Sequence, residues 1–139
     1  MIVAVHALLG ATLARLCKTH TQAAVLGSAS HPLADMLPHR DLDVPGEALL
    51  LAATLTLIAA SRGVGSREFA GALGAAAPDL ENLIGRMFGI PDEQLLLPTH
   101  SQYHGRKSRD FSGQVAIALV GLAALFLPAG SCDSQPPTW

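Results

Sequence analysis

Residues 30–41, with the sequence SHPLADMLPHRD, gather histidine and aspartate side chains in a chain rich in alanine, leucine and glycine. His31 and Asp35 stand four positions apart, a spacing that on a helix places two side chains on one face, about 5 to 6 Å apart. An imidazole and a carboxylate at that separation can bind one divalent cation. His39 follows four positions later, directly after Pro38. Three potential metal ligands therefore recur at every fourth residue.

Further potential ligands occur elsewhere in the chain. His6 lies in the first apolar segment, Asp79 follows Pro78, and His100 and His104 again stand four positions apart. Zinc is held by imidazole nitrogens and carboxylate oxygens at about 2.0 to 2.2 Å, so its ligands must converge from several helices. An ionised carboxylate in apolar surroundings is costly unless it is paired or coordinated. These polar residues therefore predict a metal site between helices.

The same residues also fit structural roles. His6 fits a buried histidine of the core or of an interface, and His31 with Asp35 fits a hydrogen-bonded pair in which the carboxylate orients the ring. His39 fits a residue at a helix end. Asp79 fits a helix start, where a carboxylate caps the backbone and favours the positive end of the helix dipole.

His100 and His104 precede the basic segment 105–109, GRKSR, and fit exposed surface groups beside it. The basic residues of that segment are either solvated charges or, close to a metal, groups that hold an anionic substrate. His20 lies in the polar connection CKTHTQ and is not predicted as a ligand.

Composition limits the classes of function. The chain has 139 residues, which is the size of one domain. Only 14% of them are charged, and mean hydropathy is +0.36, whereas a typical soluble domain is about 25% charged. This imbalance indicates a membrane-associated protein or a very apolar helical bundle. The net charge of −2 and the aromatic content of 4% argue against a nucleic-acid partner. Cys17 and Cys132 match no thiolate metal motif.

Hydrophobic periodicity predicts an all-α fold, a small helical bundle associated with a membrane. Helices are predicted over residues 2–17, 21–37, 46–63 and 111–130. The second should be interrupted locally at Pro32, because proline lacks a backbone donor and disfavours helical geometry at the preceding residue. Residues 85–94, GRMFGIPDEQ, indicate a helix end followed by a loop.

Residues 1–128 are predicted to form one helical domain, and the polar, proline-rich residues 129–139 a disordered tail. The last predicted helix carries the longest uncharged run, about 18 residues, against 14 in the third. A transmembrane helix needs about 20 apolar residues. The last helix is therefore the better candidate for a membrane span.

The segment SASHPLADMLPHRD resembles the signature SH-x-x-x-D-x-x-PH-x-D of a group of small bacterial membrane proteins described as membrane-bound metal-dependent hydrolases. GALGAAAPDLENL resembles the G-x-x-x-A-x-x-PD element of the same group, and LLPTHSQYHG resembles its later histidine segment. More remotely, the H-x-x-x-D pair resembles the zinc-dependent phospholipase C and single-strand nuclease superfamily. The resemblance covers about residues 3–127.

This resemblance implies that the polar residues face one common site. The implied metal ligands are His6, His31, Asp35, His39, Asp79, His100 and His104, with Asp35 and Asp79 also the candidate catalytic carboxylates. The predicted function is a metal-dependent hydrolase that holds a divalent cation, zinc, and acts on a small-molecule or lipid phosphoester. Membrane lipid is the expected partner, and the bacterial inner membrane is the expected location, with the cytoplasm second. A metal-binding protein without catalysis and a purely structural helical protein stay open as alternatives.

Overall fold

The computed structural model describes residues 1–91, 94 and 111–128. Within these ranges the chain forms helices and no strand, which confirms the predicted all-α bundle. The helices are α1 (Val3–Ala14), α2 (His20–Asp35), α3 (Val44–Arg62), α4 (Arg67–Phe88) and α6 (Ser112–Phe126). The predicted tail 129–139 lies outside the described residues, and the predicted single domain over residues 1–128 stays a prediction.

Local sequence signals explain where the helices begin and end. Thr19 and Gln22 form a capping box at the start of α2, in which each side chain accepts a hydrogen bond from the other residue's backbone N–H. The side chain of Ser66 accepts a hydrogen bond from the backbone N–H of Phe69 at the start of α4. Gly89 ends α4 with a φ of 66°, a conformation that glycine adopts without steric cost.

Two prolines lie inside helices rather than at their boundaries. Pro32 stands within α2, which continues to Asp35, so His31 and Asp35 keep their helical spacing. Pro78 stands within α4, which runs ten residues further. The interpretation of Asp79 as a helix start is therefore wrong. Each proline removes a backbone hydrogen bond, but packing against neighbouring helices supplies most of the stability of a helix in a folded protein.

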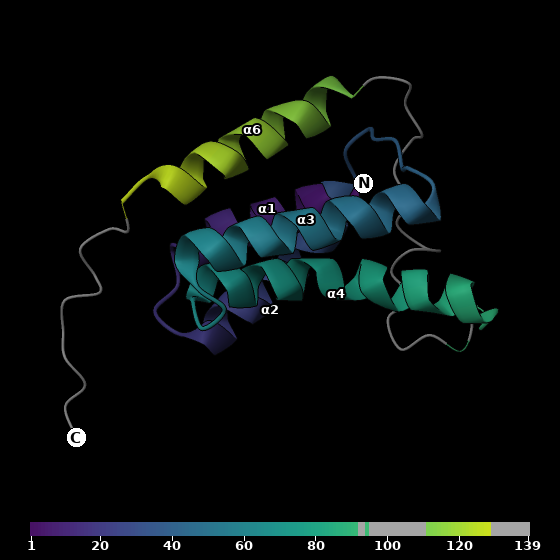
Figure 1. The fold of residues 1–139 in the computed structure, drawn as a ribbon, viewed down its shortest axis with the longest axis horizontal. Coiled ribbons are helices and arrows are strands. Elements are labelled where there is room, and N and C mark those ends of the chain that lie inside the picture. Colours follow the sequence, from purple (N-terminus) through teal and green to yellow (C-terminus); the bar gives the residue numbers. More distant parts are fainter. Residues whose placement is uncertain (92–93, 95–110, 129–139) are drawn as a thin grey trace.

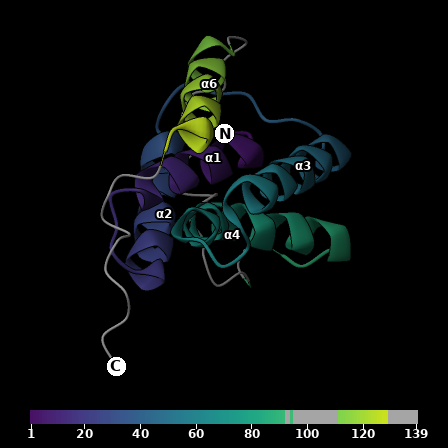
Figure 2. The same ribbon diagram turned by 60° about the vertical axis from the view of Figure 1, so that its left-hand side comes forward.

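Helices α1, α2 and α4 pack together at unusually close range, and glycine makes this possible. A Cβ atom on Gly10 of α1 or on Gly27 of α2 would lie 2.3 Å from the backbone oxygen of Gly71 in α4. A Cβ atom on Gly74 would lie 2.2 Å from the backbone oxygen of Ala24. The backbone of α4 therefore approaches the backbones of α1 and α2 closely, with only small side chains beside the glycines. Figures 1 and 2 show α4 lying against both α1 and α2.

Helix α6 lies along α1, on the side away from α4 (Figures 1 and 2). At one end, the side chain of Gln114 accepts a hydrogen bond from the backbone N–H of Ile2 (3.0 Å) and donates one to the carbonyl of Arg40 (3.1 Å). At the other end, Arg15 and Arg62 donate hydrogen bonds to the carbonyl of Leu127, where the helix itself leaves carbonyls unpaired. Both ends of α6 are thus tied to the bundle.

One described helix, α3, is long and apolar enough to cross a membrane, and only 17% of its apolar window is buried in the bundle. Helix α6 is only 15 residues long, about 22 Å at 1.5 Å per residue, whereas the hydrocarbon core of a bilayer is about 30 Å thick. The structure therefore reverses the predicted order of the two candidates. The uncharged run overestimates the length of the helix, because the last apolar residues of the run lie beyond the end of α6.

The close contact between Gly71 and Gly10 predicts that a larger residue at position 71 lowers stability. Gly71→Ala should lower the free energy of unfolding by about 1 to 3 kcal/mol, because the new Cβ would lie 2.5 Å from the backbone oxygen of Gly10. Gly113→Ala is the matched control, since nothing lies within 4 Å of a Cβ placed there. Thermal unfolding followed by circular dichroism measures both. Equal stability of Gly71→Ala and the wild type would contradict the proposed role of the contact.

Candidate metal centre

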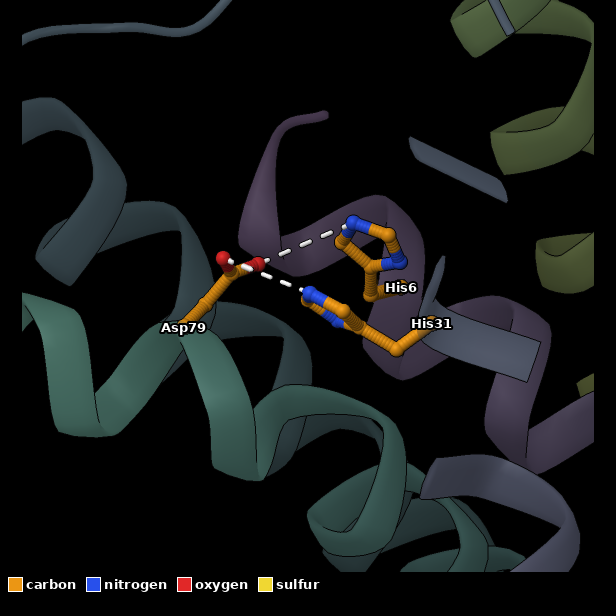
Figure 3. Close-up of side chains that lie close together, drawn as sticks. All are labelled: His6, His31 and Asp79. Atoms are coloured by element: carbon orange, nitrogen blue, oxygen red, sulfur yellow. Dashed lines mark ion pairs between the residues drawn. The ribbon is translucent and has the colours of Figure 1, made fainter. Parts of the chain in front are cut away.

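Four of the predicted site residues meet between α1, α2 and α4. His6 comes from α1, His31 and Asp35 from α2, and Asp79 from α4. The two histidines are completely buried, and the exposed fractions of Asp35 and Asp79 are 2% and 4%. Figure 3 shows the side chains of His6, His31 and Asp79 pointing toward one another. The close packing of the three helices thus brings together residues from both halves of the sequence.

The ring nitrogens of the two histidines lie between the two carboxylates. His6 Nε2 is 3.0 Å from Asp35 Oδ1 and 3.7 Å from Asp79 Oδ2. His31 Nε2 is 3.3 Å from Asp35 Oδ2 and 3.7 Å from Asp79 Oδ1. A tetrahedral ion with ligands at about 2.0 to 2.1 Å separates neighbouring donor atoms by roughly 3.3 Å. The donor atoms of His6, His31 and Asp79 all lie within 4.8 Å of one another and could close around one ion, and Asp35 lies beside them, within 3.3 Å of both Nε2 atoms.

His31 is oriented by the backbone of α4. Its Nδ1 lies 2.9 Å from the carbonyl oxygen of Ala75, and because a carbonyl only accepts, Nδ1 carries the proton and donates it. Nε2 then faces the carboxylates, which is the arrangement found in metal-binding histidines. Ala75 lies one helical turn before Asp79. The rings of His6 and His31 also stack, with centroids 4.0 Å apart and an interplanar angle of 25°.

Burial and the neighbouring charges shift the pKa values of the cluster in different directions. Burial lowers the pKa of His6 to about 4, so its ring is neutral at pH 7. Burial also disfavours the charge on Asp35, but hydrogen bonds from His31 and His6 outweigh it and hold the pKa of Asp35 well below its usual range. Burial, together with the charge of Asp35, raises the pKa of Asp79 to about 7. The cluster therefore holds one firmly ionised carboxylate and a second that titrates near neutral pH.

The pKa of His31 shifts in the opposite direction to the pKa of His6. Burial lowers the pKa of His31, but the interactions with Asp35 and Asp79 outweigh burial, and its pKa is raised overall. Its Nδ1 proton points to the carbonyl of Ala75, so the additional proton is on Nε2, between the carboxylates. A divalent cation would take the place of this proton.

His39 lies beside the four-residue cluster rather than within it. Its Nδ1 donates a hydrogen bond to the carbonyl of Leu37 (2.7 Å), and its Nε2 is 3.6 Å from Asp41 Oδ1. The amino group of Met1 lies between Asp35 Oδ1 (2.7 Å) and Asp41 Oδ1 (3.2 Å). In the described part of the chain, the donor atoms within 4.8 Å of one another come from His6, His31 and Asp79. Predicted ligands His100 and His104 lie outside the described residues.

Two buried polar residues that the sequence analysis missed hold the start of α1 in place. Glu47 of α3 accepts hydrogen bonds from the backbone N–H groups of Val3 and Leu42, each at 2.9 Å. Gln114 of α6 accepts one from Ile2. Both act on the turn that precedes His6. Their one signal in the sequence is a polar side chain at the start of a very apolar segment, which is also the ordinary pattern of a solvated helix end.

A small pocket opens beside the cluster. It has a volume of about 50 Å³ and is lined by Asp79 together with Asp41, Glu47 and Asn82. One water molecule needs roughly 10 to 15 Å³ of such space, so the pocket can hold a few waters next to Asp79. Asp35 does not line it. Of the two candidate catalytic carboxylates, Asp79 is therefore the one that lines this pocket, although both side chains are buried.

Comparison of the chain with protein-family models, curated proteins and solved structures finds no match. The resemblance to membrane-bound metal-dependent hydrolases accordingly stays a prediction.

The raised pKa of Asp79 predicts a pH-dependent effect of its neutralisation. Between pH 4 and pH 7 the folded state binds a proton on Asp79 that the unfolded state does not bind, so this residue makes folding less favourable as the pH rises. In chelator-treated protein, Asp79→Asn should therefore gain stability relative to the wild type from pH 5 to pH 8. Melting temperatures at both pH values measure the difference. A difference that shrinks with increasing pH would contradict the raised pKa.

Proposed function

We propose that the chain binds one divalent cation through His6, His31, Asp35 and Asp79 and is a metal-dependent hydrolase of phosphoesters. The observation that carries this proposal is the position of the two Nε2 atoms between two carboxylates, at separations of 3.0 to 3.7 Å. The hydrogen bond from His31 to Ala75 supports it further, because it presents Nε2 to the cluster before any ion binds.

Zinc is the cation that this donor set favours. Two imidazole nitrogens and two carboxylate oxygens are ordinary zinc ligands, and zinc can expand from four ligands to five when a water or substrate oxygen joins the shell. Magnesium and calcium prefer six or more oxygen ligands, so two imidazoles in the shell argue against both. His39, His100 and His104 remain predicted as further ligands or as neighbours of the ion.

The proposed reaction uses the two carboxylates differently. A divalent cation, when bound, polarises a phosphoryl oxygen and lowers the pKa of water. Asp35, enclosed by both histidines, orients the rings and contributes negative charge. Asp79 lines the pocket and accepts the proton of a water molecule there. The water oxygen forms a bond to phosphorus, the bond from phosphorus to the leaving oxygen breaks, and the leaving oxygen takes up the proton.

A location at the bacterial inner membrane belongs to the same proposal. Helix α3 has the length and composition of a membrane span, and it presents large apolar side chains to its surroundings: Leu49 is 71% exposed. Helix α6 does the same with Val120 and Phe126, at 64% and 72%. Exposed apolar surface of this extent on two helices is unfavourable in water and favourable in lipid.

One observation favours a second candidate, a metal-binding protein without catalysis. His6 and His31 have no exposed surface, and closed sites with four protein ligands are typical of structural zinc. The position of Asp79 beside the pocket supports the catalytic candidate, since a catalytic site needs a carboxylate beside water.

Metal analysis tests the site. The purified wild type should contain about one zinc ion per chain, and His31→Gln should lose it, with affinity weakened by more than roughly 100-fold, because loss of even a supporting residue around a metal costs 10- to 100-fold. His20→Gln is the matched control: His20 lies on the same helix, is exposed, and contacts the carbonyl of Gly65 rather than the cluster. Zinc-free wild type, or equal zinc content in the two variants, would exclude this site.

Asp35→Asn tests catalysis against a structural role. The hydrolase proposal predicts that this variant stays folded, binds zinc more weakly and no longer releases 4-nitrophenol from bis(4-nitrophenyl) phosphate. A purely structural cluster predicts instead a loss of about 1 to 3 kcal/mol of stability with no metal to lose. Zinc content, melting temperature and turnover are measured together on both proteins. Zinc-loaded wild type without turnover would favour the non-catalytic alternative.

A further inference from the structure

A basic hollow lies far from the metal centre, between the α1–α2 and α3–α4 connections. Both connections are at the end of the bundle away from the N-terminus (Figure 1). The hollow has a volume of about 410 Å³, and its lining includes Lys18, His20, Arg62, Ser66, Arg67 and Glu68. On α4, Arg67 lies twelve residues before Asp79, which is about 18 Å along the helix axis. The basic hollow and the metal centre are therefore separate sites.

Positive charge predominates in the lining of the basic hollow. Lys18, Arg62 and Arg67 are cationic at neutral pH, whereas Glu68 is the one carboxylate among the described residues that line it. Clustered charges of one sign around a concave surface raise the local concentration of ions of the opposite sign. The hollow therefore favours an anionic ligand.

Two of these cations have donor groups to spare. In the described part of the chain, no ion pair joins Lys18 or Arg62 to a carboxylate. Arg62 donates from Nη2 to the carbonyls of Ala124 (3.2 Å) and Leu127. Its Nη1 donates to none of the described residues, and its Nε is buried without a hydrogen-bond partner. An anion beside Arg62 would offset this unpaired charge.

Hydrogen bonds hold the walls of the basic hollow in place without a ligand. His20 Nε2 lies 2.7 Å from the carbonyl oxygen of Gly65, and because a carbonyl only accepts, Nε2 donates. Arg67 donates to the carbonyl of Cys17. Both bonds join the α1–α2 side of the hollow to its α3–α4 side. Groups that are already fixed lose less conformational freedom when a ligand binds.

A phosphate group suits this arrangement of donors. Its several oxygens accept charge-assisted hydrogen bonds from lysine and arginine at the same time. The volume of the hollow is far larger than the roughly 10 to 15 Å³ that one water molecule needs, so the organic part of a ligand also fits. Arg62 is the last residue of α3, the helix that is long and apolar enough to cross a membrane. In a bilayer, the hollow would lie near the lipid phosphates.

We infer that the basic hollow binds the phosphate group of an anionic ligand, which is held there and not hydrolysed. Soluble phosphate esters and the head groups of anionic lipids share this chemistry. The inference goes beyond the proposed hydrolase and does not depend on it, because none of the proposed metal ligands lines the hollow.

Single substitutions separate this site from other sources of anion binding. Lys18→Gln removes a cation of the hollow whose side chain is exposed and bonds to no other described residue, so the fold should persist. Lys18→Arg keeps the charge. Arg40→Gln is the matched control, since it removes the same charge from an exposed residue at the other end of the bundle. His31→Gln removes a proposed zinc ligand and leaves the hollow unaltered.

Binding is measured at neutral pH on protein in dodecyl maltoside. Calorimetry follows glycerol 1-phosphate, with glycerol as the uncharged control, and native mass spectrometry compares phosphatidylglycerol with phosphatidylcholine. The wild type should bind one molecule of glycerol 1-phosphate, of phosphatidylglycerol, or of either. Lys18→Gln should weaken that binding about tenfold, because it removes a charge-assisted hydrogen bond. Lys18→Arg, Arg40→Gln and His31→Gln should bind as the wild type does.

The two ligands distinguish the sources of the phosphate group. Binding of glycerol 1-phosphate supports the inference with a soluble ligand, and binding of phosphatidylglycerol supports it with a lipid head group. A wild type that binds neither overturns it. Equal weakening by Lys18→Gln and Arg40→Gln also overturns it, because the effect would then come from net charge. Loss of binding in His31→Gln alone overturns it as well, since the phosphate would then be bound at the metal centre.

Discussion

The close backbone contact of α1, α2 and α4 at Gly10, Gly27 and Gly71 is the constraint on which the candidate site depends. Both Gly10 and Gly27 face the same backbone oxygen, that of Gly71, with no space for a methyl group. His6 lies one turn before Gly10, and His31 lies one turn after Gly27. The contact therefore sets the distance between the two imidazoles. A bulkier residue would separate the helices by more than the few tenths of an ångström that metal ligands tolerate.

The packing of the helices buries the carboxylates of Asp35 and Asp79 in a bundle with few polar groups to stabilise their charge. Hydrogen bonds stabilise Asp35 as an anion, whereas burial and the nearby charge of Asp35 disfavour ionisation of Asp79 and raise its pKa. A divalent cation between the carboxylates would remove that cost. The free energy that disfavours the ionised cluster in the absence of metal is thus available to favour metal binding.

The sequence predicts how site residues close to one another in the chain are arranged. His31 and Asp35 were expected to face the same direction because four residues make about one helical turn, and α2 preserves that relation through Pro32. The sequence predicts Asp79 as a ligand, but Pro78 before it also fits a helix start. Only the packing of α4 decides between them. Glu47 was missed because its partners are backbone N–H groups, which every residue except proline carries.

The amino-acid sequence by itself determined the helical class, the scarcity of charge and the identity of the residues able to bind a metal, because composition and periodicity depend on neighbours along the chain. Tertiary structure alone decided which of these residues meet. Convergence of His6, His31 and Asp79 requires three helix axes to approach at particular heights, and that register depends on contacts such as Gly10 with Gly71, which are 61 residues apart. No pattern along one helix encodes such a distance, since it arises from the fit of two surfaces.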